Sequence, residues 1–396
     1  MNNSARKTTT RIILSLGLAT LLTCLGCIKK QGAVSGEATN STASNEILVG
    51  EYGSMTGSES TFGVSTHKGI LMAFDEVNKA GGVNGKKIQL KNYDDQGQAA
   101  EAVTIITKLI TQDKVSLILG EVASSRSIAA GAIAQQYKIP MVSPSSTNPK
   151  VTQIGDYIFR VCFIDPFQGS VMARFAINNL KLKRAAVFRD IKADYSVGLA
   201  NFFVDEYKKL GGEVLADVSY SSGDMDFKSQ LTSIKGKNPD VLFVPGYYTE
   251  VGLIARQARE LGLKAVLLGG DGWDSEKLTE IGGTAIEGGY FSNHYSHEDQ
   301  SPVVQNFVAQ FKARYGEVPS GLAAQGYDAA MVAVDAMKRA KDSSSKAYRD
   351  ALAETKNFQG VTGMITINEE RNAVKPAVVL KVVGPKKFSY VTTINP

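Results

Sequence analysis

Short hydroxyl side chains follow two apolar segments in the first half of the chain. Ser124 and Ser125 come after one segment, and Ser145 to Thr147 come after the next. Hydroxyls at a helix start, with free backbone N–H groups and the helix dipole, can hold a carboxylate without a basic side chain. The same residues commonly act as helix caps and turn residues, and by themselves they favour that simpler interpretation.

Three later residues offer the opposite chemistry, because they can accept hydrogen bonds or carry negative charge. Tyr195, Tyr247 and Asp271 each follow an apolar, strand-like run. An ammonium group removed from water must be paired, and a carboxylate with phenolic oxygens can pair it. Trp273, the only tryptophan, follows Asp271 closely. It is a candidate for shaping a bound side chain, with an anchor for a surface loop as the equal alternative.

Catalytic chemistry finds little support in the sequence. A hydrolase requires an activated nucleophile beside a base. Ser124 has no evident base, the chain has 3 histidines, and no Gly-x-Ser-x-Gly motif occurs. We therefore expect a protein that is not an enzyme.

Metal and phosphate sites are also poorly supported. The segment 294–299 (HYSHED) combines imidazoles and carboxylates, which are metal ligands, but it lacks a His-Glu-x-x-His frame. We interpret it as a solvated polar loop. The segment 81–87 (GGVNGKK) lacks the spacing of a phosphate-binding loop and the hydroxyl after its lysines. We expect neither a metal nor a cofactor.

Strand-like and helix-like segments alternate along most of the chain. This alternation predicts βαβ units around parallel sheets, and the uniformly apolar strands predict sheets covered on both faces. In such sheets ligands bind beyond the carboxyl ends of the strands, where the polar residues above fall. The strand-like segments are 47–55, 87–95, 116–120, 139–146, 157–163, 185–190, 213–220, 240–246, 265–272, 363–368, 377–383 and 390–394.

The length and composition fit an ordinary soluble protein of about two domains. The chain has 396 residues, with 43% hydrophobic and 21% charged residues. Much of the net charge of +5 lies in residues 1–27, so the near-neutral remainder argues against a nucleic-acid partner. Outside that segment Cys162 is the only cysteine, so no intramolecular disulfide is expected.

The first 27 residues read as an export signal. Basic residues precede the apolar stretch 12–22, which is too short to span a bilayer. Gly26-Cys27 resembles a bacterial lipobox, although Cys24 stands where that motif usually has leucine. We expect acylation of Cys27, with an ordinary cleaved signal as the alternative, and a flexible tether over 28–45.

Several short motifs, taken in order, resemble those of the type I periplasmic binding proteins, specifically the leucine/isoleucine/valine-binding family. The resemblance covers residues 46–396. The motifs are Met55-Thr56-Gly57, the segment 80–85 (AGGVNG), Tyr93-Asp94-Asp95, Gly246-Tyr247 and the segment 269–272 (GGDG).

The resemblance implies an α/β fold of two doubly wound parallel-sheet lobes joined by three crossover segments near 163, 293 and 369. The implied boundaries are 46–163 with 294–368 for lobe 1, and 164–293 with 369–396 for lobe 2. The ligand cleft lies between the lobes.

The resemblance also implies a set of ligand-binding residues. Asp271 stands where the family usually has glutamate, so the ligand must sit deeper or differ in shape. Phe62 matches an aromatic position that covers the ligand. The complete expected set is Ser124, Ser145 and Thr147 for a carboxylate, with Tyr195, Tyr247, Asp271, Phe62 and Trp273.

One feature of some members is missing. These proteins carry a disulfide where this chain has Gln96-Gly97 and Val122-Ala123. We therefore expect the loop before Ser124 to be held by packing alone.

In function, the resemblance implies the extracytoplasmic substrate-binding component of an ABC importer. It would bind an amino acid, by default a branched-chain one, by hinge closure. The implied partners are the membrane permease subunits and, through Cys27, the membrane itself. The protein would be an exported monomer of the cell envelope or periplasm. The alternative is a sensing lipoprotein that presents an amino acid, amide or small acid to a membrane receptor.

Overall fold

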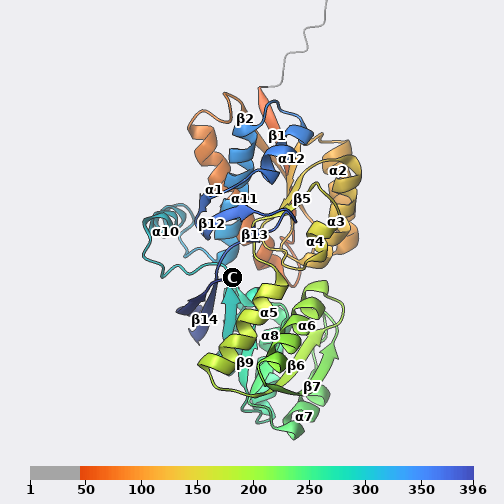
Figure 1. Ribbon diagram of the computed structural model, residues 1–396, viewed down its shortest axis with the longest axis vertical. Helices are drawn as coiled ribbons and strands as arrows, with labels where there is room; N and C mark the ends of the chain where they lie inside the picture. Colours follow the sequence, from red (N-terminus) through yellow and green to blue (C-terminus); the bar gives the residue numbers. More distant parts are fainter. Residues whose placement is uncertain (1–44) are drawn as a thin grey trace, which may run out of the picture. The chain divides into compact units, whose positions relative to one another are not determined.

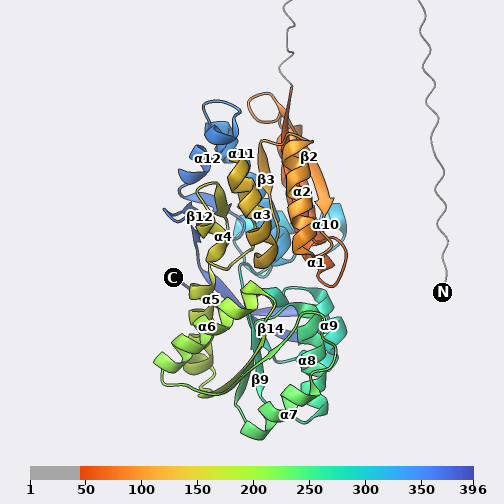
Figure 2. The same cartoon turned by 90° about the vertical axis from the view of Figure 1, so that its right-hand side faces the viewer.

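The computed structural model describes residues 45–396. The expected signal over 1–27, with Cys27, and all but the last residue of the expected tether lie outside the described residues. Alternating strands and helices build two main β-sheets, and Figures 1 and 2 show the elements of each sheet in a lobe of their own.

The first sheet is entirely parallel, with the strand order β2-β1-β3-β4-β5. Its central strands are short and buried, as expected for a sheet covered on both faces. The strands are β1 (Glu46–Gly53), β2 (Lys87–Asp94), β3 (Leu117–Leu119), β4 (Met141–Ser143) and β5 (Ile158–Arg160).

Helices cover both faces of this sheet. One apolar cluster joins it to α1, α11 and α12, and another joins it to α2 and α3. The helices of this lobe are α1 (Ser60–Lys79), α2 (Ala99–Thr111), α3 (Ser124–Tyr137), α4 (Lys150–Gln153), α10 (Pro302–Tyr315), α11 (Gly321–Arg339) and α12 (Ser345–Ala353). A small sheet of β11 (Phe358–Gly360), β12 (Gly363–Ile367) and β13 (Ala373–Val374) completes it.

The second sheet has the strand order β15-β14-β10-β9-β8-β6-β7. Five strands run parallel, whereas β14 pairs antiparallel with β10 and forms an antiparallel hairpin with the edge strand β15. The strands are β6 (Arg184–Asp190), β7 (Glu213–Tyr220), β8 (Val241–Phe243), β9 (Val266–Gly269), β10 (Tyr290–Asn293), β14 (Ala377–Gly384) and β15 (Lys387–Ile394). The doubly wound fold expected from the sequence is therefore present, with an antiparallel edge.

The helices of the second lobe pack in neighbouring pairs, α5 on α6 and α8 on α9. Helix α5 continues into a π-helical turn, and Asp271 lies in a short 3₁₀ turn after β9. The elements are α5 (Asp165–Arg174), η1 (Phe175–Asn179), α6 (Asp194–Lys209), α7 (Lys228–Lys237), α8 (Tyr248–Glu260), η2 (Asp271–Trp273), α9 (Glu276–Gly282) and η3 (Gly283–Ile286).

The chain passes between the two sheets three times. The passages lie between β5 and α5, between β10 and α10, and between β13 and β14. The third falls after Val374, because β13 still pairs with β12 of the first lobe, whereas the sequence placed this boundary at 368/369. The sequence of these strands does not show where the chain leaves the first lobe, since β12, β13 and β14 all contain apolar residues.

Candidate functional site

The hydroxyls of the first lobe lie at the carboxyl ends of β3 and β4. Ser124 is the first residue of α3, yet the N-cap position is Ala123, so Ser124 does not cap the helix. Its Oγ accepts a hydrogen bond of 3.2 Å from the N–H of Asn148. The interpretation of Ser124 as a simple helix cap is therefore wrong.

Ser145 and Thr147 are buried, and their hydroxyls have no hydrogen-bond partner within residues 45–396. The turn that carries them is held by other serines. Ser143 accepts from the N–H of Ser146, and Ser146 donates to the carbonyl of Val122 at 2.9 Å. Buried polar atoms are rarely left unpaired, so these two hydroxyls remain candidates for contact with a ligand.

Asp165 adds an acid that the sequence analysis missed. It begins α5 at the first passage, is fully buried, and neither carboxylate oxygen has a hydrogen-bond partner in the described chain. Burial raises its pKa well above the usual value, and the nearby Thr147 hydroxyl opposes that shift without reaching hydrogen-bonding geometry. An Asp-Pro pair at a helix start is an ordinary N-terminal signal, so no sequence pattern distinguishes Asp165 from a structural residue.

The aromatic residues of the site come from both lobes. Tyr195 and Tyr247 stack with ring centroids 5.3 Å apart, and Phe62 of α1 meets Tyr247 edge-on at 5.4 Å. Burial raises the pKa of both tyrosines, so they stay neutral and can donate or accept hydrogen bonds. The apolar cluster around these rings also includes Val122, Ala123 and Leu322.

Asp271 is buried, with 6% of its surface exposed, and both of its carboxylate oxygens are bonded. Oδ1 accepts from Gln168 Nε2 at 2.7 Å, and Oδ2 lies 3.0 Å from His294 Nε2. The expected solvated loop at 294–299 is therefore wrong at its start, because His294 and Tyr295 are buried. Among residues 45–396 no group of three or more His, Cys, Asp or Glu side chains could hold a metal ion.

Trp273 does not face the ligand site. Its ring is fully buried in the core of the second lobe, near Phe291 and against the backbone of Gly269. Its Nε1 donates to the carbonyl of Val244 at 3.0 Å. Both sequence interpretations, a ligand-shaping ring and a surface anchor, are corrected by this position, because the side chain turns inward under β9.

Hydrogen bonds close the rim of the site on two sides. On one side Ser125 donates to the Asp194 carboxylate at 3.0 Å, and Asn148 donates to the Asp194 carbonyl at 2.7 Å. On the other side Thr249 donates to the Ser58 carbonyl at 2.6 Å. Each bond joins one lobe to the other, so the described conformation is closed.

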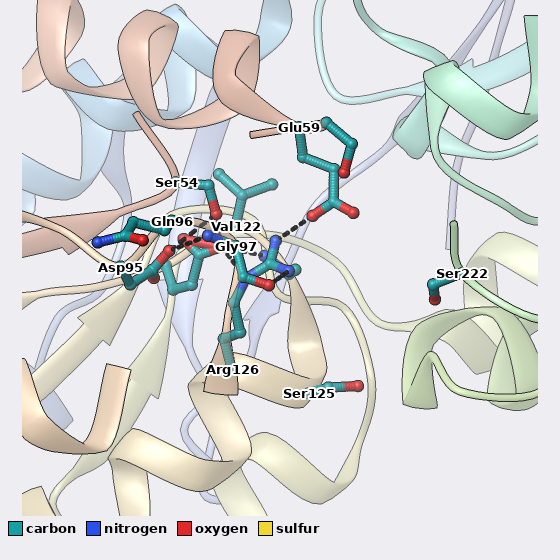
Figure 3. A network of polar contacts seen from close by, with 12 residues as sticks. Ser54, Glu59, Asp95, Gln96, Gly97, Val122, Ser125, Arg126 and Ser222 are labelled. Atoms are coloured by element: carbon teal, nitrogen blue, oxygen red, sulfur yellow. Dashed lines mark hydrogen bonds and ion pairs between the residues drawn. The ribbon is translucent and has the colours of Figure 1, made fainter. Parts of the chain in front are cut away.

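A buried ionic network holds the loops of the first lobe (Figure 3). Arg126 donates to Glu121 at 2.7 Å, to Glu59 at 2.5 Å and to the Gly97 carbonyl at 3.1 Å. Ser54 bonds the carboxylates of both Asp95 and Glu121. The loop before Ser124 is therefore not held by packing alone, because these bonds join it to the segment around Gly97.

The charges of this network are unequal, with three carboxylates around one guanidinium. Burial alone would lower the pKa of Arg126, but the carboxylates of Glu121 and Glu59 raise it, so the guanidinium stays charged. Burial and the neighbouring Glu121 raise the pKa of Asp95 to about 7. The network thus depends on Arg126 to balance its acids.

Two doubly wound lobes joined by hydrogen bonds, with polar residues gathered at the carboxyl ends of their strands, are the architecture of a two-lobed binding protein. Residues 46–387 match the family described as periplasmic binding proteins, and the chain belongs to that family. Membership implies an exported protein. None of the helices in residues 45–396 is long and apolar enough to cross a bilayer.

Relatives of known name agree with this assignment. The chain is 31% identical over 340 residues to the leucine-, isoleucine-, valine-, threonine- and alanine-binding protein of Pseudomonas aeruginosa, covering 85% of this chain and 90% of that protein. The leucine-binding protein LivK of Thermotoga maritima has a similar structure, with a TM-score of 0.85 and 43% identity over 88% of this chain and 99% of that one.

A third relative was solved with its ligand. The branched-chain amino acid transporter substrate-binding protein LivJ of Streptococcus pneumoniae, in complex with isoleucine, has a TM-score of 0.84 and 35% identity. The alignment covers 89% of this chain and 100% of that chain. The fold and the family expected from the sequence are confirmed.

Proposed function

We propose that this chain is the extracytoplasmic substrate-binding component of an ABC importer and that it binds an amino acid with an apolar, branched side chain. One observation supports the proposal: Ser145 and Thr147 of the first lobe and Asp165 of the second are buried without hydrogen-bond partners in residues 45–396, while hydrogen bonds join the two lobes beside them. An α-amino acid carries a carboxylate and an ammonium on one carbon, so it can bridge both halves. The named relatives bind ligands of this kind.

The polar residues of the site then form two groups, one for each charged group of the ligand. Ser124, Ser145 and Thr147 bind the carboxylate, helped by the N-terminus of α3. Asp271 and Asp165 bind the ammonium group, which must be paired when it leaves water.

The aromatic and aliphatic residues shape the remainder of the site. Tyr195 supplies a phenolic oxygen near the ammonium, while Phe62, Tyr247 and Leu322 pack against the ligand side chain. Since each lobe holds only half of the partners, ligand binding favours the closed arrangement, and closure creates the surface that a permease recognises. No observation on the described residues favours a sensing role over transport.

A comparison of leucine with two analogues, each of which lacks one of its charged groups, tests the proposal. Leucine at about a hundred times its Kd should stabilise the folded protein by about 2.7 kcal/mol in a thermal-shift measurement. Isocaproate lacks the ammonium and isoamylamine lacks the carboxylate, so each should stabilise far less. Small-angle scattering should show a smaller radius with leucine than without it. Equal stabilisation by all three compounds would exclude recognition of a zwitterion.

We further propose that Cys27 is the acylated N-terminus that holds the protein at a membrane. The lipobox-like Gly26-Cys27 and the tether-like composition of 28–45 support this. Mass spectrometry of the membrane-extracted protein should find a lipid on Cys27. Cys27→Ser should release the protein from the membrane fraction, whereas the matched control Cys24→Ser should leave it there. An unmodified thiol on Cys27, or a mature chain that starts elsewhere, contradicts the proposal.

A further inference from the structure

His294 occupies a position that connects the proposed ammonium site to the hinge. It directly follows β10, where the chain leaves the second sheet at the second passage, and only 3% of its surface is exposed. Its ring stacks on Phe163, with centroids 3.7 Å apart and planes inclined by 24°. Phe163 belongs to the first passage, so one ring contact links two of the three connections between the lobes.

The protonation of His294 follows from its surroundings. Nε2 faces the Asp271 carboxylate, whereas Nδ1 has no hydrogen-bond partner within residues 45–396. Burial lowers the pKa of His294 to about 4; Asp271 opposes this shift, and Lys375 of the third passage adds to it. The ring is therefore neutral near pH 7. A neutral imidazole beside a carboxylate carries its proton on the facing nitrogen, so Nε2–H donates to Asp271.

Two side chains of the protein itself donate hydrogen bonds to the Asp271 carboxylate. Gln168 of α5 donates to one carboxylate oxygen, and His294 donates to the other. A carboxylate oxygen can accept more than one hydrogen bond, so both oxygens keep lone pairs for a ligand. The side chain of Asp271 is short, and two fixed donors determine the direction in which the remaining lone pairs point.

We propose that His294 is a positioning residue, whose Nε2–H fixes the Asp271 carboxylate for the ligand ammonium and whose stack on Phe163 ties that carboxylate to the hinge. The inference rests on the proposed function, in which Asp271 binds the ammonium group. A histidine that only fills space would affect stability, but it would not affect how well the protein distinguishes an amino acid from its deaminated analogue. Discrimination is therefore the quantity to measure.

Two substitutions separate the ring contact of His294 from its hydrogen-bond donor. His294→Phe keeps a flat ring for the contact with Phe163 but removes the donor, and His294→Gln keeps an N–H donor but removes the ring. We expect His294→Phe to weaken leucine binding roughly 10- to 100-fold, as for loss of a hydrogen bond to a charged group. Isocaproate binding should change much less, so discrimination falls. His294→Gln should keep most of the discrimination.

A double-mutant cycle and a spectrum of the unliganded protein complete the test. In an Asp271→Asn background, His294→Phe should cause little further loss of leucine affinity, because the two residues act through one contact. Nitrogen-15 NMR of the wild type, with His294 assigned from the missing signals of His294→Phe, should show a neutral ring protonated on Nε2.

The outcomes distinguish failure of the proposed function from failure of the role of His294. A wild type that binds no amino acid rejects the proposed function, whereas the NMR measurement needs no ligand and judges His294 by itself. A charged ring, or a proton on Nδ1 at pH 7, overturns the role of His294. So does a His294→Phe protein that loses stability but still discriminates leucine from isocaproate as the wild type does. If His294→Phe does not fold, the NMR measurement decides, with His294 assigned from the missing signals of His294→Gln.

Discussion

Replacing Asp271 with alanine should weaken amino-acid binding by about 3–5 kcal/mol, the effect typical of breaking a desolvated charge pair. The loss is large because the closed site excludes water from the ammonium group. The substitution also leaves Gln168 and His294 with donors that face each other across an empty position. Calorimetric titration with the best amino acid from the thermal-shift screen measures the change.

The control for this substitution is Asp205→Ala. Asp205 is an exposed acid on α6 of the same lobe, so its removal changes the net charge equally without touching the site. Its affinity should equal that of the wild type. Normal binding by Asp271→Ala, or equal wild-type affinity for the deaminated analogue, would reject the assignment of Asp271 and with it the amino-acid ligand.

Replacing Arg126 with methionine should lower the free energy of unfolding of the first lobe by about 3–5 kcal/mol. Methionine keeps much of the side-chain volume but leaves the buried carboxylates of Glu59 and Glu121 without their positive partner. The β2–α2 loop also loses its bond to α3 at Gly97. Ligand affinity should fall as well, because α3 begins with Ser124.

Because the only tryptophan lies in the second lobe, the loss of stability can be assigned to one lobe. Trp273 reports on the second lobe, whereas far-ultraviolet circular dichroism reports on both lobes. In urea, Arg126→Met should shift the dichroism transition more than the fluorescence transition. The control Arg314→Met breaks a partly exposed pair with Asp75 and should cost at most about 1 kcal/mol.

A second substitution tests the cause of this loss. Combining Arg126→Met with Glu121→Gln removes one of the uncompensated charges, so part of the lost stability should return. If Arg126→Met costs no more than Arg314→Met, the network does not hold the loops, and packing alone is sufficient after all.

The sequence by itself determined the fold class and the edge of the sheets at which the candidate site residues lie. Both follow from local patterns, because apolar strand segments such as 116–120 and 240–246 predict buried parallel strands wherever they pack. The polar residues that end these segments, Ser124 and Tyr247 among them, must then gather at the carboxyl ends of the strands. Spacing along the chain was sufficient for these conclusions.

Only the tertiary structure decided which polar residues meet. Asp271 bonds Gln168 and His294, which lie 103 and 23 residues away in sequence, and no local pattern encodes contacts of that range. Likewise the chain alone could not tell that Trp273 turns into the core or that Arg126 ties three loops together. The direction of a side chain depends on neighbours brought in by folding, and the close packing of the interior then allows few arrangements.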